Sequence, residues 1–173
     1  MLKKRIVVAF AAMVLASLLA SLLAGGAALA ATKIFTDTVQ GVEVSPGQVD
    51  EETNTRVGVT FVGHAEGPFP GVMYASLDYT PSSPAPDGGV NTIVGGTWSL
   101  KGPQGVVYGT FTGGRVDWNE NGTVATVVAT MTISGGSGKG KQLTGGSGTF
   151  DGTLSHLTFP PTVAGTLTLT TPP

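Results

Sequence analysis

The sequence has no cysteine and few charged or aromatic side chains. Of its 173 residues, 12% are charged and 7% are aromatic, whereas 40% are hydrophobic. The absence of cysteine excludes a disulfide scaffold, and it also excludes a lipid anchor on a cysteine thiol. The hydrophobic content argues against a disordered chain. A hydrophobic core must therefore supply the stability of the fold.

Cations are scarce and scattered beyond the first thirty residues. The chain has nine Lys and Arg residues and eleven acids, and three of the bases but none of the acids lie in residues 1–30. Residues 31–173 therefore contain six bases and eleven acids, a net charge of −5. Nucleic acids and anionic membranes bind clustered cations. The sequence argues against both as partners.

The amino terminus has the three parts of an export signal. Residues 3–5 are all basic, residues 6–24 are uncharged and mainly apolar, and Ala28 and Ala30 occupy the two positions that a signal peptidase reads. We predict cleavage after Ala30, secretion to the periplasm or the exterior, and a single mature domain of residues 31–173 without stable membrane insertion. The alternative is an uncleaved anchor, because the apolar stretch approaches the roughly 20 residues that span a bilayer.

The rest of the chain has the period of β-strands, and no stretch of it has the period of an amphipathic helix. About eight strands are predicted, over residues 34–44, 56–66, 73–79, 93–101, 106–118, 123–133, 148–157 and 162–170. Short glycine-rich turns join them, among them residues 102–105 and 135–140, and Asn121-Gly122 predicts a type I′ turn. Strands joined in this way pair antiparallel with their sequence neighbours. The predicted fold is an all-β antiparallel meander barrel, which has no exposed edges, and the alternative is a β-sandwich.

Alternation also predicts the inner face of each strand. In the second strand this face holds Val57, Val59 and Phe61, with Arg56 on the opposite face. The fourth strand is predicted to turn a different set inward, namely Val94, Trp98 and Leu100. The sixth is predicted to turn inward Ala125, Val127, Ala129, Met131 and Ile133.

Two glycine-rich runs are similar to the hairpin of the allene oxide cyclase and dirigent-type barrel superfamily. They are Thr132-Ile-Ser-Gly-Gly-Ser-Gly-Lys139 and Gly145-Gly-Ser-Gly-Thr-Phe-Asp-Gly152, and the resemblance covers residues 95–157. It implies an eight-stranded barrel, a lumen that accepts small apolar molecules, and a homo-oligomer, since family members are frequently dimers or trimers. Gly140 stands where the family pattern usually has an aromatic residue. No active-site motif of the family is present, so no catalytic position is carried over.

Motifs for phosphate or metal binding are incomplete. The glycine-rich segment 135–141 begins like a phosphate loop, but Gln142 follows where a Ser or Thr hydroxyl is needed. His64 and His156 are far apart in sequence, and no cysteine supplements them. Zinc needs three or four such ligands. We therefore assign no cofactor and no metal.

Six side chains are candidates for contact with a ligand in the lumen. His156 shares a strand face with Phe150 and Leu154, and imidazole exchanges protons near neutral pH, so it is a candidate acid or base at one mouth of the barrel. The alternative is a structural histidine bonded to the backbone beside the following proline turn. The other candidates, for which a place in the core is the alternative, are Trp98, Tyr79 and Tyr108.

The favoured function is a non-catalytic binding or surface-associated module for a small apolar ligand, and the alternative is a cyclase or isomerase. Trp98 is expected to reach such a ligand, whereas Trp118, at the edge of the 121–122 turn, is expected to be indifferent to it. A cavity of several hundred Å³ with convergent polar groups would favour the enzyme. A solidly packed lumen would favour a structural role.

Overall fold

The computed structural model describes residues 31–81 and 89–173, and residues 32–173 form one compact unit. The strands are β1 (Ile34–Asp50), β2 (Thr55–Glu66), β3 (Gly71–Pro81), β4 (Val90–Gly102), β5 (Gly105–Trp118), β6 (Val124–Gly138), β7 (Ser147–Ser155) and β8 (Thr162–Thr170). A short 3-10 helix, η1 (Lys139–Leu143), joins β6 to β7. The predicted export signal lies outside the described residues.

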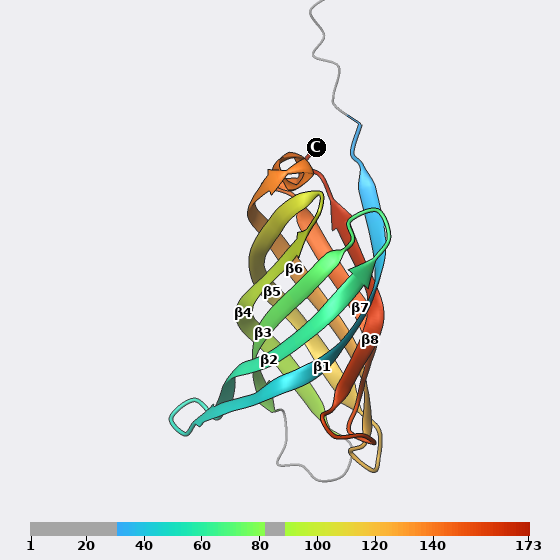
Figure 1. Cartoon of the computed structure of the whole chain (residues 1–173). Coiled ribbons are helices and arrows are strands. Elements are labelled where there is room, and N and C mark those ends of the chain that lie inside the picture. The colour runs from blue at the N-terminus through green and yellow to red at the C-terminus, as the bar shows by residue number, and fades with distance from the viewer. Residues whose placement is uncertain (1–30, 82–88) are drawn as a thin grey trace, which may run out of the picture. The chain divides into compact units, whose positions relative to one another are not determined.

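The eight strands form a closed antiparallel barrel. Each strand pairs with its sequence neighbours, and β8 returns to pair with β1 along residues 34–42. Figure 1 shows the strands running obliquely around the barrel. This confirms the predicted meander barrel rather than the alternative sandwich. Short connections make sequential pairing the easiest arrangement, and closure removes the two unpaired edges.

A β-bulge in β2 reverses two predicted orientations. Val57 and Gly58 together oppose Asp78 of β3, and Gly58 has φ +75° and donates its N–H to the Asp78 carboxylate at 2.9 Å. The extra residue interrupts the alternation, as bulges do. Val57 is consequently 45% exposed, and Arg56 lines the lumen. The prediction that placed Val57 inside and Arg56 outside is wrong.

Bulges in β4 and β5 have the same effect. The extra residue in β4 is Val94, which is 53% exposed, so Ile93 takes the inward position at 2% exposure. The prediction for Val94 is wrong for this reason. The extra residue in β5 is Thr112. Beyond it the alternation is reversed. Uninterrupted alternation would place Trp118 on the same face as the outward-facing Tyr108, but Trp118 faces the lumen.

Two predicted turns also differ from the structure. The β5–β6 loop runs from Asn119 to Thr123, and Gly122 has φ +63°, whereas Asn121 is not among the residues with positive φ. The turn is therefore not type I′, which needs positive φ at both central residues. Instead, the Asn119 side-chain oxygen accepts the N–H groups of Thr123 and Val124, at 2.9 and 3.2 Å.

The glycine-rich segment after Ile133 continues β6 instead of forming a turn. Strand β6 runs to Gly138, and the connection to β7 begins with η1. The predicted inner face of β6 is confirmed, because its five residues are all buried: Ala125, Val127, Ala129, Met131 and Ile133.

One end of the lumen is packed solid, and we call it the closed end. It is where β1 begins, β8 ends and β2 connects to β3, at the top of Figure 1. Phe69, in the β2–β3 connection, is 1% exposed and meets the edge of the Phe35 ring at a centroid distance of 6.3 Å. The same end contains fully buried side chains from several strands and from η1, among them Trp98, Leu100, Ile133, Leu143, Leu167 and Leu169.

The closed end also buries a carboxyl group. Asp37 is 1% exposed, and its Oδ1 accepts the Phe69 N–H at 2.8 Å, while its Oδ2 has no hydrogen-bond partner in the described part of the chain. Burial raises the pKa of Asp37 above its ordinary value of 3.8, and the Phe69 hydrogen bond partly opposes this rise. The folded protein therefore keeps this proton to a higher pH than the unfolded chain does. Its free energy of unfolding falls as the pH rises through that interval.

We expect Asp37→Asn to abolish this loss of stability, because an amide does not ionise. Urea unfolding at about pH 3 and about pH 7 measures it. The free energy of unfolding of the variant minus that of the natural protein should therefore be larger at the higher pH than at the lower pH. Asp151→Asn, on the exposed side of β7, is the control and should show no such gain. An equal difference between the Asp37→Asn variant and the natural protein at both pH values would show that the buried carboxyl does not control the effect.

Candidate functional site

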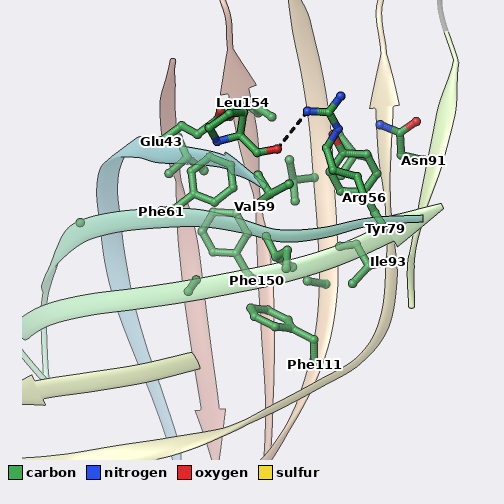
Figure 2. Close-up of a pocket in the computed structure, with 18 of the residues that line it drawn as sticks. Glu43, Arg56, Val59, Phe61, Tyr79, Asn91, Ile93, Phe111, Phe150 and Leu154 are labelled. Atoms are coloured by element: carbon green, nitrogen blue, oxygen red, sulfur yellow. Dashed lines mark hydrogen bonds between the residues drawn. The ribbon is translucent and has the colours of Figure 1, made fainter. Parts of the chain in front are cut away.

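The lumen is hollow between the closed end and the opposite end, which we call the mouth. The hollow part is a cavity of about 300 Å³, at the lower limit of small-molecule sites. Its wall is apolar, with side chains that include Phe61, Met73, Ala75, Phe111, Ala129 and Phe150. The three phenylalanines are labelled in Figure 2. The lumen is therefore filled by side chains at the closed end and hollow toward the mouth.

Polar side chains line the cavity near the mouth. Each comes from a segment near that end of the barrel, four from strands and one from just after β7, and the set is Glu43, Arg56, Tyr79, Asn91 and His156. Figure 2 shows Arg56, Tyr79 and Asn91 together on one side, and Glu43 on the other. The cavity thus combines an apolar interior with a polar rim, which is the usual composition of a small-molecule site.

Four of the six candidate residues line this cavity. They are Tyr79, Phe150, Leu154 and His156. Strand β7 ends at Ser155, so His156 follows the strand instead of belonging to it. The backbone N–H of His156 donates to the Thr123 carbonyl at 2.8 Å. The structure thus brings these four side chains to the wall of one cavity, although two separate segments of the sequence supply them.

Trp98 and Tyr108 do not line the cavity, contrary to the expectation. Trp98 faces inward but lies in the packed region, is 2% exposed, and donates its indole N–H to the Thr132 carbonyl at 3.3 Å. Tyr108 is 49% exposed on the outer surface of β5. The tryptophan at the cavity is Trp118, whose ring lies 4.6 Å from that of His156 between centroids. The β5 bulge thus turns Trp118 toward the cavity, whereas the sequence predicted a tryptophan at the edge of the turn that is indifferent to a ligand.

Arg56 is the basic side chain that the sequence patterns misplaced. Its Nη1 donates to the Pro46 carbonyl at 2.9 Å, drawn as a dashed line in Figure 2. The ion pair in the described part of the chain joins Arg115 and Asp117, which both lie in β5. Arg56 forms no ion pair with any described residue. Its guanidinium has five N–H donors. Most of them therefore remain available at the mouth.

Glu43 brings an acid to the same mouth. Burial raises the pKa of Glu43 above its ordinary value of 4.5, and the positive charges of His156 and Arg56 oppose the rise. Burial also raises the pKa of Tyr79; Arg56 opposes that rise and Glu43 adds to it. These mutual effects show that the groups at the mouth form one electrostatic unit.

Three of the rim side chains form no hydrogen bond with any described residue, namely those of Glu43, Tyr79 and Asn91. Polar groups that are removed from water are normally hydrogen-bonded. Here they remain free to bind water or a ligand.

The described residues contain no group of three or more His, Asp or Glu side chains that could hold a metal ion. Over the same residues, no helix is long and apolar enough to cross a membrane. No family model matches the sequence, and neither a curated protein nor a solved structure matches it significantly. The resemblance to the allene oxide cyclase and dirigent-type barrels stays a prediction.

Proposed function

We propose that the protein is an exported module that binds a small, mainly apolar molecule inside the barrel. The observation that carries this proposal is the cavity of about 300 Å³, with an apolar wall and a polar rim at one end. A protein that used its barrel only as a scaffold would gain stability by filling this space with side chains, as it does at the closed end. An apolar molecule that enters through the mouth would bury its surface against the same wall.

The cavity limits the size of the ligand. At about 30 Å³ for each water-sized group, a volume of about 300 Å³ holds roughly ten non-hydrogen atoms. The closed end blocks the other side of the lumen, so an elongated molecule would enter with its apolar end first. Its polar end would then lie among the rim residues.

A cyclase or isomerase is the second candidate, and the convergence of Glu43, Arg56 and Tyr79 favours it. It comes second because the cavity of about 300 Å³ is at the lower limit of small-molecule sites and the sequence has no active-site motif of such an enzyme. A carboxyl group can exchange a proton with a bound molecule, and the neighbouring donors can stabilise negative charge on an oxygen. Native mass spectrometry of the protein purified from its source would identify a retained molecule. Incubation of that molecule with the protein would then distinguish binding from turnover.

Tryptophan fluorescence tests the binding function, because the two tryptophans lie in different environments. Titration with octanol should change the emission of Trp118 at the cavity and leave that of Trp98 in the packed region unchanged. Trp118→Phe should therefore remove most of the signal. Trp98→Phe is the matched control and should retain it. If no small apolar compound changes the emission up to its solubility limit, the binding function is wrong.

A further inference from the structure

Three hydrogen-bond donors lie side by side on one side of the mouth. Arg56 of β2 is the cross-strand partner of Tyr79 in β3, and Asn91 of β4 is the cross-strand partner of Pro81, two positions after Tyr79. Side chains at opposite and diagonal positions of paired strands are within reach of one another. Figure 2 shows the three together, apart from Glu43. A guanidinium, a phenol and an amide thus face the same part of the cavity.

This group of donors has no anionic acceptor bonded to it; the charge of Glu43 acts on Arg56 from the other side of the mouth without an ion pair. Arg56 uses one N–H for the Pro46 carbonyl and forms no ion pair in the described part of the chain, and the Tyr79 hydroxyl and the Asn91 amide have no partner there. Arg56 is half-buried and borders an apolar cavity. A charge that is partly removed from water is unfavourable unless an opposite charge or several hydrogen bonds compensate it. An anionic oxygen group would supply both.

We propose that the ligand is a small carboxylic acid with an apolar body, whose carboxylate binds to Arg56, Tyr79 and Asn91. A carboxylate is planar and accepts two parallel N–H bonds from a guanidinium, and its remaining lone pairs accept from the phenol and the amide. The apolar body, of about ten non-hydrogen atoms, fills the cavity below. This inference rests on the proposed binding function and adds the chemistry of the head group.

Glu43 on the other side of the mouth gives the site its orientation. When Glu43 is ionised, its negative charge repels the carboxylate of a ligand. This repulsion keeps the carboxylate on the Arg56 side of the mouth. The Glu43→Gln variant loses this charge but keeps the size of the side chain. It should bind a carboxylate more tightly and a neutral molecule equally well.

Three compounds with the same chain and different head groups test the inference, namely octanoate, octanol and octylamine. Calorimetric titration of the purified protein at one pH should show octanoate as the tightest ligand. Arg56→Gln should weaken octanoate binding roughly tenfold or more, since a charge-assisted bond is lost, and should leave octanol binding unchanged. Arg115→Gln, an exposed arginine paired with Asp117 outside the cavity, is the matched control and should bind all three as the natural protein does.

Tyr79→Phe keeps the inference testable if Arg56→Gln disturbs the β1–β2 hairpin through its bond to Pro46. Only the hydroxyl is removed, so octanoate binding should weaken several-fold while octanol binding should not. Equal binding of octanol and octanoate, unaffected by either variant, would overturn the carboxylate and leave the binding function intact. Preferential binding of octylamine would also overturn it and identify Glu43 as the recognition group. Binding of none of the three would overturn the binding function itself.

Discussion

Replacement of Phe69 by alanine should lower the free energy of unfolding by about 3–5 kcal/mol, the usual cost of deleting a buried aromatic ring. Phe69 is 1% exposed and lies in the β2–β3 connection, where its ring packs against the edge of Phe35. Its removal would leave a void among neighbours that are held by the closed sheet. Such neighbours collapse poorly into a cavity, and the cost should therefore be high for this residue type.

Urea unfolding followed by circular dichroism measures this effect. The chain offers a matched control in Phe159→Ala, because Phe159 is 97% exposed in the β7–β8 connection. The two variants delete the same atoms from opposite environments. Equal unfolding midpoints for both variants would contradict the conclusion that the buried Phe69 ring stabilises the closed end.

The strands and their order follow from the sequence because their causes are local. Alternation over residues 123–133 and 162–170 gives the strand period, and short turns leave no room for any pairing except that of neighbours. Each predicted strand overlaps an observed one. Closure does not follow from the number of strands, because the same strands could form a sandwich; it is seen only in the pairing of β8 with β1. The ends were less predictable: β1 was expected to end near residue 44 and continues to Asp50, where it pairs with the start of β2.

The orientation of side chains beyond a bulge does not follow from alternation. One extra residue at Val57 and Gly58 reverses the order, and Val94 does the same in β4. Glycine at positive φ is the local signal of the β2 bulge, but the chain has 27 glycines, so this signal selects no single position. A bulge is visible only when the partner strand is known, because it is defined by two residues that oppose one.

Three residues of the polar rim were not predicted, namely Glu43, Arg56 and Asn91, and for Arg56 the reason is the same limit. Alternation from Val39 through Gly41 places Glu43 inward, yet a charged residue is ordinarily interpreted as exposed. Arg56 and Trp118 face the cavity only because of bulges. Conversely, Tyr79, Phe150, Leu154 and His156 were placed correctly because no bulge lies between them and the apolar residues that set their phase. Functional polar groups inside a core are the positions at which patterning is expected to fail.

The largest effect on binding is expected from Ala75→Phe, which would fill the cavity with the protein's own side chain. Ala75 lies in the middle of β3, is 7% exposed and lines the cavity. The added ring would occupy space that a ligand needs, so octanoate and octanol should both bind at least about 100-fold more weakly, a loss of roughly 2.7 kcal/mol or more. Loss of both compounds separates this effect from that of Arg56→Gln, which is expected to act on the carboxylate alone.

The stability of the same variant distinguishes a hollow site from a packed core. A larger side chain in a filled core destabilises by typically 1–3 kcal/mol, because its neighbours must move. In an open cavity of about 300 Å³ the new ring buries apolar surface without that strain. Ala75→Phe should therefore keep or raise the unfolding midpoint while binding is lost. Ala164→Phe adds the same ring on the exposed side of β8 and should preserve binding. A folded Ala75→Phe variant that still binds octanol as tightly as the natural protein would show that the ligand site lies elsewhere.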